Sequence, residues 1–298
     1  MIRSAVAASL VRPVGLAPVC DELGIPRSTI YAQKAAGSRS APPGKRGPRP
    51  FVAEADLLVA IRNVLTDPPF LGEGYRKVHA RLRHVGIRAD RERIRNLMRQ
   101  HGLQAPGRPR RELGPRVHDG TITTSMPDRM WGTDATSVLL VNGQQVTIFG
   151  VYDHCTCELM GIHAALVADR FEAITTLQQA ARKAFGSVEK GIAAGLKLRH
   201  DNGSQFVSRA FQAELRFLGM ESSPSFVRAP EGNGCIERFW RTLKEQLLWI
   251  QTFASVEDLN QALREFQDHY NQNWLIGRHG HRAPTAVRQD LLGRTQAA

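Results

Sequence analysis

Hydrophobic and polar residues follow two different patterns along the chain, and the change falls near residue 126. Before that point, apolar residues recur every three or four positions, which is typical of amphipathic helices. After it, short β-favouring runs are separated by turn signals and helical stretches. Residues 129–140, 144–153 and 158–167 are predicted to be strands, and the Asn142-Gly143 pair predicts a hairpin turn between the first two.

The second half of the chain continues this alternation of strands and helices. Helical periodicity predicts helices over residues 170–185, 208–219 and 233–250, and β-favouring runs predict strands over residues 196–201 and 220–226. Three antiparallel strands followed by helix, strand, helix, strand and helix is the order of the ribonuclease H-like fold. We therefore expect an α/β core with a mixed five-stranded sheet flanked by helices.

Two short helical units precede this core. In residues 74–103, two apolar stripes at helical spacing are separated by Gly86, and Asp90 is placed to cap the second helix. A similar pattern follows Gly24, where Ser28 is a candidate cap for the next helix. Both units are predicted to be helix-turn-helix motifs, the kind that places its second helix in the major groove of DNA. For the first unit, a generic helical hairpin is the alternative.

Segments rich in Gly, Pro, Ser and Arg predict the boundaries between these parts. The clearest is "GSRSAPPGKRGPRP" at residues 37–50, and a second basic linker is expected around "APGRPRREL". The predicted division is a helix-turn-helix-like unit at 1–36, a linker at 37–50, a basic helix-turn-helix domain at 51–104, a linker at 105–125, a catalytic core at 126–290 and a tail at 291–298.

Positive charge is concentrated in the N-terminal part. The formal net charge of the chain is +12, and residues 1–125 hold 22 Lys and Arg against 10 Asp and Glu. The remaining residues hold 18 of each kind, so all of the excess lies before the core. This distribution favours a polyanionic partner such as nucleic acid, because neutralising phosphates drives such binding. A basic tail that only aids solubility is the plainer alternative.

Cysteine usage and hydropathy indicate the compartment. The four cysteines form no CxxC pair and match no common zinc spacing, which favours free thiols in a reducing, intracellular environment. No apolar run approaches the length of a membrane span. We therefore expect a cytoplasmic protein without a membrane partner, associated with the nucleoid when it is bound to DNA.

Three carboxylates are placed where they could share one chemistry. Asp134 interrupts the first predicted strand in "WGTDAT", where a charge would be costly without partners. Asp201 follows the fourth strand in "RHDNGSQF", and Glu237 lies on the last helix in "GNGCIERFWRTLK". The first and fourth strands are neighbours in the expected topology, so the three acids could converge. Carboxylates in such a cluster can hold two Mg²⁺ ions for phosphoryl transfer.

Basic residues accompany both the helical domain and the acidic cluster. They lie between the apolar positions of the second helical unit, and two more follow Glu237 at helical spacing. Phosphate contact is the favoured interpretation, and an ordinary solvated face is the alternative. The residues expected to contact DNA are Arg76, Lys77, Arg81, Arg91, Arg95, Arg241 and Lys244.

These motifs resemble those of the DDE transposases and retroviral-type integrases. The resemblance rests on "WGTDAT", "RHDNGSQF" and "GNGCIERFWRTLK", and on the 35 residues between Asp201 and Glu237. Within that superfamily the chain resembles the OrfB-type transposases of the IS-three family, whose core also follows a helix-turn-helix. One departure is the C-terminal "HYNQNWLIGRHGHRAPTAV", which keeps only part of the Tyr-Asn and Arg-Pro-His pattern of many relatives.

The resemblance implies a specific activity. Asp134, Asp201 and Glu237 would be the catalytic ligands of two Mg²⁺ or Mn²⁺ ions, and Asn202, Gly203 and Phe206 would shape the second motif. The chain would cleave DNA at the terminal repeats of an insertion sequence and join the ends to target DNA. It would self-associate as a dimer or larger assembly, and a partner or fused OrfA portion is also implied.

Two other functions are compatible with parts of the sequence. A catalytically silent DNA-binding regulator derived from a transposase would use only the basic N-terminal units, but it has no need of all three acids. A ribonuclease H-type nuclease would cut RNA–DNA hybrids without joining ends, and the basic helical units before the core argue against it. DNA transposition is therefore the expected function.

Overall fold

The computed structural model describes residues 15–37, 51–107, 122–225 and 234–296. The chain divides into two compact units, Met1–Pro50 and Phe51–Ala298. In the first unit, α2 (Leu16–Glu22) and α3 (Arg27–Gly37) are joined by a turn in which Gly24 has a positive φ of 61°. The expected cap at Ser28 is wrong, because α3 already begins at Arg27. The linker predicted at 37–50 lies outside the described residues, apart from Gly37.

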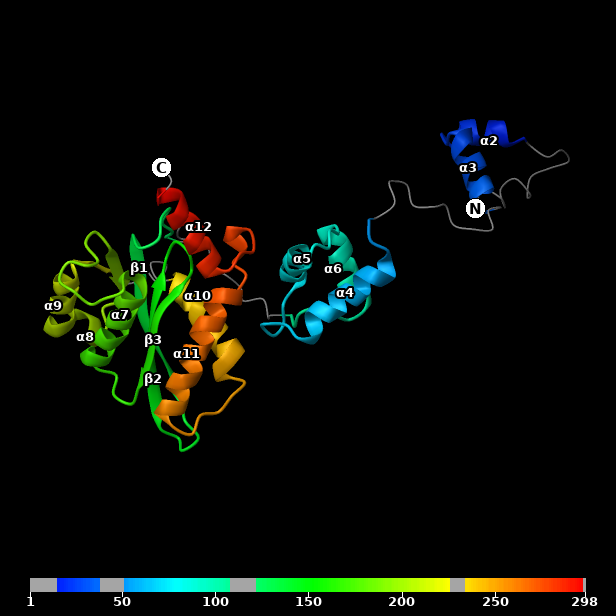
Figure 1. Ribbon diagram of the computed structural model, residues 1–298. Coiled ribbons are helices and arrows are strands. Elements are labelled where there is room, and N and C mark those ends of the chain that lie inside the picture. Colours follow the sequence, from blue (N-terminus) through cyan, green and yellow to red (C-terminus); the bar gives the residue numbers. More distant parts are fainter. Residues whose placement is uncertain (1–14, 38–50, 108–121, 226–233, 297–298) are drawn as a thin grey trace. The chain divides into compact units, whose positions relative to one another are not determined.

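The second unit begins with three helices, α4 (Glu54–Thr66), α5 (Tyr75–His84) and α6 (Arg91–Gln100), drawn in blue to teal in Figure 1. The Asp90 carboxylate caps α6 by accepting from the backbone N–H groups of Glu92 and Arg93, which confirms the predicted cap. The apolar stripes of the three helices enclose one buried cluster. It contains Leu57, Ile61, Val78, Leu82, Ile94, Leu97 and Met98.

A mixed five-stranded sheet follows, in the order β3-β2-β1-β4-β5. The first three strands are antiparallel, and β4 and β5 run parallel to β1. The Asn142-Gly143 turn joins the first two as predicted, with Gly143 at a φ of 82°. The strands are β1 (Met130–Leu139), β2 (Gln145–Asp153), β3 (Leu159–Ala165), β4 (Lys197–His200) and β5 (Glu221–Pro224).

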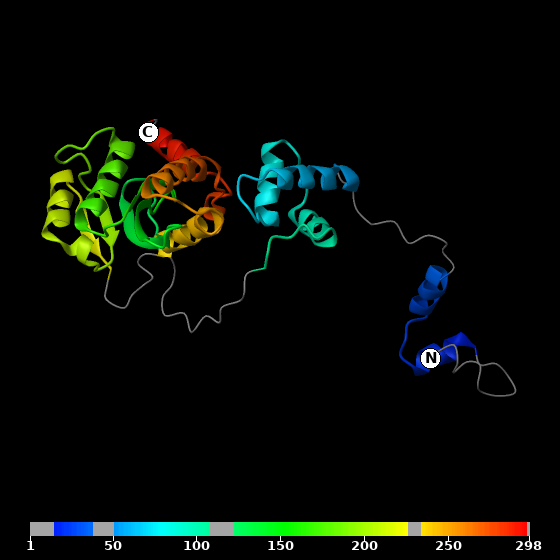
Figure 2. The ribbon, with the colours of Figure 1, turned by 90° about the horizontal axis from the view of Figure 1, so that it is seen from below.

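Helices cover both faces of the sheet, and each face has its own buried cluster. Figures 1 and 2 show α7 to α9 on one face and α10 and α11 on the other. The predicted ribonuclease H-like architecture is therefore confirmed. The helices are α7 (Arg170–Phe185), α8 (Ser204–Val207), α9 (Arg209–Leu218), α10 (Gly234–Leu243), α11 (Val256–Asn273) and α12 (Pro284–Gln296).

The helix predicted over residues 233–250 is shorter and less regular than expected. The α-helical part ends at Leu243, and a π-helical turn, η2 (Lys244–Leu248), follows it. Near the C-terminus, the 3₁₀ turn η3 (Gly277–His279) precedes α12, which continues beyond residue 290, where a tail was predicted. No helix among the described residues is long and apolar enough to cross a membrane.

Candidate functional site

The register of two parallel strands brings Asp134 and Asp201 to the same level of the sheet. β1 pairs with β4 through Gly132 opposite Arg199. Two residues further along the chain from each member of this pair are Asp134, still within β1, and Asp201, just after β4 ends. The sequence prediction that the first and fourth strands are neighbours is therefore confirmed.

The Asp134 carboxylate lies in a largely buried environment. The Trp240 indole N–H donates to Asp134 Oδ2 at 3.0 Å. Burial raises the pKa of Asp134 from its ordinary value to about 6, and the nearby negative charges of Asp201 and Glu237 add to the rise. Hydrogen bonds from the Ala135 backbone and from Trp240 oppose it. Both other acids are thus within electrostatic reach of Asp134.

Asp201 occupies an exposed turn that its own side chain organises. Asp201 Oδ1 accepts a hydrogen bond from the Gly203 backbone N–H at 2.9 Å. Asn202 donates to the Ser225 carbonyl at 3.3 Å, which links this turn to the residue after β5. Phe206 is fully buried and anchors α8 under the turn. The motif therefore presents its carboxylate on an ordered loop at the end of a buried strand.

Glu237 is exposed in the first turn of α10, one turn before Trp240. The opposite face of this helix packs into the core, because Ile236, Trp240 and Leu243 are buried. Among the residues that the structure describes, no three His, Cys, Asp or Glu side chains are grouped closely enough to hold a metal ion. Asp134, Asp201 and Glu237 thus converge on one region without forming a closed set of ligands.

Trp240 and Gly150 complete this region, and the sequence analysis gave neither residue a role in it. Gly150 is the partner of Asp134 across the β1–β2 ladder. A Cβ atom added to Gly150 would lie 2.7 Å from Trp240 Cη2, so the indole packs directly on the backbone of β2. The spacing of Trp240 three residues after Glu237 was the available signal for a role beside the acids.

Two of the basic residues expected to contact DNA have protein partners instead. The Arg81 guanidinium forms two hydrogen bonds with the carboxylate of Glu73, which is only 3% exposed, and donates to the Asn273 carbonyl at 3.2 Å. The Lys77 ammonium lies 3.8 Å from Glu73 and 3.0 Å from the centre of the Trp274 ring. These contacts assign Lys77 and Arg81 to packing between α5 and the end of α11.

The other predicted basic residues lie on the surface. Arg76 and Arg91 are exposed, and exposed Arg95 forms an ion pair with Glu92 within α6. Arg241 is exposed and Lys244 is half-buried, one and two turns beyond Glu237 on α10 and η2. None of these five side chains is buried, so their contact with phosphates stays a prediction.

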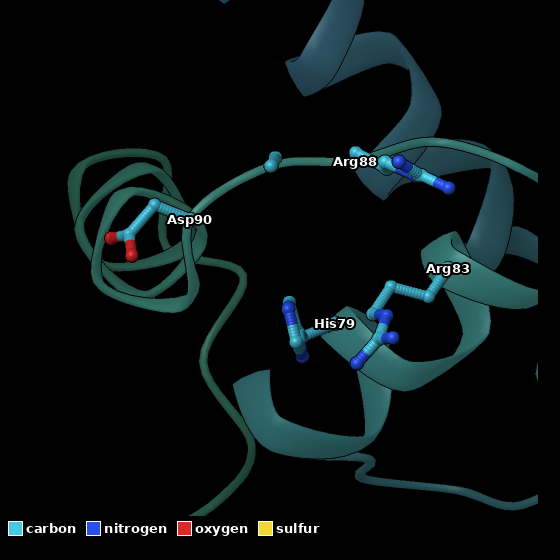
Figure 3. Close-up of a pocket in the computed structure, with 5 residues that line it drawn as sticks. His79, Arg83, Arg88 and Asp90 are labelled. Carbon is cyan, nitrogen blue, oxygen red and sulfur yellow. The ribbon is translucent and has the colours of Figure 1, made fainter.

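A basic pocket lies beside the turn between α5 and α6 (Figure 3). Its volume is about 590 Å³, and it is lined by His79 and Arg83 of α5 and by Arg88, Ala89 and Asp90 of the turn. Burial and the charges of Arg83 and Arg91 lower the pKa of His79, and Asp90 opposes this. The signal in the sequence was the i, i+4 spacing of His79 and Arg83, followed by Arg88 in the turn.

Family models match both the helical domain and the α/β core of the second unit. Two family models described as "Integrase core domain" match residues 124–230 and 218–284, and a model described as "HTH-like domain" matches residues 54–111. The chain is 27% identical over 241 residues to the transposase InsD for insertion element IS2A/D/F/H/I/K of Escherichia coli, covering 78% of this chain and 77% of the relative.

Solved structures that are similar to this chain include two integrase catalytic core domains. The HTLV-2 integrase catalytic core domain in complex with magnesium is 17% identical, with a TM-score of 0.42, covering 55% of this chain and 97% of that one. The catalytic core domain of BIV integrase is 18% identical, with a TM-score of 0.41, covering 57% and 99%.

Proposed function

The chain belongs to the insertion-sequence transposases of the DDE and integrase superfamily, and on that premise we propose that Asp134, Asp201 and Glu237 together carry out DNA strand cleavage and joining. The observation that supports this assignment best is the environment of Asp134. Its carboxylate lies at the same level of the sheet as Asp201, and the negative charges of Asp201 and Glu237 both raise its pKa.

The donor set fits a divalent metal ion. Carboxylate oxygens are the ligands that Mg²⁺ and Mn²⁺ prefer, and a cation would offset the repulsion that the charges of Asp201 and Glu237 exert on the Asp134 carboxylate. Asp134, Asp201 and Glu237 would hold the metal, with two ions as the proposed number. When bound, such ions activate the attacking water or hydroxyl group and stabilise the leaving oxygen of a phosphodiester. The protein contributes β1, which carries Asp134, and the turn after β4, which carries Asp201.

DNA is the proposed substrate and partner, and two groups of side chains are suited to bind it. The exposed arginines and the pocket of the helical domain would contact phosphates near the element end. Arg241 and Lys244 would contact phosphates beside the acids, because they extend from the same helix as Glu237. Lys77 and Arg81 are left out of this assignment, since both are paired with Glu73.

Transposition also needs a higher assembly. Two element ends must be held together for joining, so we propose that at least two copies of the chain act side by side. The OrfA partner implied by the family resemblance would add end recognition, and the complex would work on the bacterial nucleoid. A binding-only regulator would have no need of the three acids.

The activity can be tested with a labelled DNA fragment that carries an end of the element. Purified chain is incubated with this DNA in Mg²⁺ and, separately, in EDTA. We expect cleavage and joining that require the metal and that are abolished in Asp134→Asn, Asp201→Asn and Glu237→Gln, while DNA binding is retained. The exposed Glu257→Gln on α11 is the matched control and should keep full activity. Cleavage that persists in one of the three variants would remove that residue from the site.

A further inference from the structure

We propose that Trp240 is a positioning residue that holds the Asp134 carboxylate in the orientation needed for metal binding. This inference rests on the proposed function, because it takes Asp134 as a ligand. It starts from one contact, the hydrogen bond that the Trp240 indole N–H donates to Asp134 Oδ2 at 3.0 Å. The two residues are 106 positions apart in the sequence, so the bond joins α10 to β1 across the core.

The indole has little freedom to move. Trp240 is 5% exposed, and its ring lies 5.3 Å from that of Phe239, which in turn packs against Tyr270 of α11. An indole has a single donor and no acceptor, so one bond satisfies it completely. A buried tryptophan could satisfy its N–H with any nearby acceptor. In this protein the acceptor is the side chain of a proposed ligand.

Gly150 makes this arrangement possible. It lies directly opposite Asp134 in the β1–β2 ladder, on the strand that the indole covers. The nearest indole carbon would be only 2.7 Å from a Cβ atom at this position, which is closer than real Cβ contacts allow. Any larger residue would push the ring away from the sheet. The glycine therefore allows Trp240 to reach over β2 and meet the carboxylate on β1.

A fixed donor on Asp134 Oδ2 also determines the direction in which Asp134 Oδ1 points. With Oδ2 held by the indole, the side chain cannot rotate freely, so Oδ1 keeps one direction. Hydrogen bonds of this kind to metal ligands typically change metal affinity by about 10- to 100-fold when they are removed. Because Trp240 and Glu237 share the first two turns of α10, the same bond also ties the helix that carries Glu237 to Asp134.

The test is Mn²⁺ binding to the full chain, measured from the electron paramagnetic resonance signal of free Mn²⁺. Wild type is compared with Trp240→Phe, with Asp134→Asn and with Trp249→Phe, a control at a tryptophan that is 71% exposed. We expect about 10-fold weaker binding in Trp240→Phe, no change in Trp249→Phe, and loss in Asp134→Asn. Circular dichroism and the Tm check that the fold is kept.

A second variant separates the hydrogen bond from the packing. Replacing Trp240 with β-(3-benzothienyl)alanine keeps the size and shape of the ring but removes the N–H donor. Equally weakened Mn²⁺ binding in this variant would support the positioning role even if Trp240→Phe failed to fold. Wild-type affinity in the benzothienyl variant would overturn the inference and leave the proposed function intact. Mn²⁺ binding that is absent in wild type, or unaffected by Asp134→Asn, would instead overturn the proposed metal site.

Discussion

Both carboxylate oxygens of Glu73 accept hydrogen bonds from the guanidinium of Arg81, and the Glu73 side chain is almost completely buried. Arg81 is therefore held in a buried ion pair. Its third bond, to the carbonyl of Asn273, connects α5 with the end of α11. Lys77 is a second cationic neighbour of Glu73. One buried acid therefore pairs with two of the basic residues that the sequence analysis expected to contact phosphates.

Removing one member of this pair should destabilise the protein. Loss of one partner leaves the other charge buried without compensation, which typically costs about 3–5 kcal/mol. We expect Glu73→Gln and Arg81→Met each to lower the free energy of unfolding by about 3 kcal/mol, measured by urea denaturation. Arg95→Met, at an exposed ion pair, should change it by less than about 1 kcal/mol. If the Arg81→Met variant had normal stability but bound DNA weakly, Arg81 would be a DNA-contacting residue.

The basic pocket beside the α5–α6 turn should contribute to DNA affinity. The double variant Arg83→Gln, Arg88→Gln removes two of its cations without touching the buried cluster of the helical domain. Each lost phosphate contact should reduce the slope of log affinity against log salt by about 0.9. Fluorescence anisotropy with a labelled element end at several salt concentrations measures this slope. Arg62→Gln, at an exposed arginine on α4, is the control for the loss of one cation outside the pocket. If the double variant and the control have the same slope, the pocket does not contact DNA phosphates.

His79 should make DNA binding sensitive to pH. Its pKa lies below the ordinary value of 6.5, so the side chain is mostly neutral at pH 7. A phosphate in the pocket would favour the protonated form, so binding would take up a proton, and affinity should rise as pH falls through 6.5 and below. The charged and titratable neighbours are Arg83 on α5, Asp90 and Arg91 at the start of α6, and His281 before α12.

The comparison of two histidine variants isolates this effect. We expect His79→Gln to flatten the rise in affinity between pH 7.5 and pH 5.5, while His84→Gln, an exposed histidine of the same helix, keeps it. The free protein should show the opposite trend in stability. Because the folded state disfavours protonated His79, it binds fewer protons than the unfolded state, and stability falls as pH drops below 6.5. Parallel pH profiles in wild type and His79→Gln would rule out this role.

The parts that could be predicted from the sequence depend on local patterns or on topology. The Asp90 cap follows from residues within one turn, and the adjacency of β1 and β4 follows from the order of strands and helices. The adjacency of these two strands was enough to bring Asp134 and Asp201 to one level of the sheet. The assignment of these acids as metal ligands stays a prediction.

The parts that could not be predicted depend on contacts between residues far apart in the sequence. The bond from Trp240 to Asp134 and the bond from Arg81 to Asn273 cross 106 and 192 positions. Spacing on one helix shows which face a residue occupies, but it does not show what lies opposite that face. Arg81 matched the pattern of a solvated basic residue, and only the packing of α5 reveals its buried partner, Glu73.

The two cations beyond Glu237 should act on substrate DNA without affecting the metal. Arg241 and Lys244 extend one and two turns further along the same helical axis, and neither contributes an oxygen ligand. We expect the double variant Arg241→Gln, Lys244→Gln to weaken DNA binding, to lower the salt slope by up to about 1.8, and to slow strand joining. Its Mn²⁺ affinity should equal that of wild type. The control is Arg264→Gln, an exposed arginine on α11, which should leave both DNA and metal binding unchanged. If the double variant lost Mn²⁺ binding instead, these residues would be supporting the acids rather than contacting phosphates.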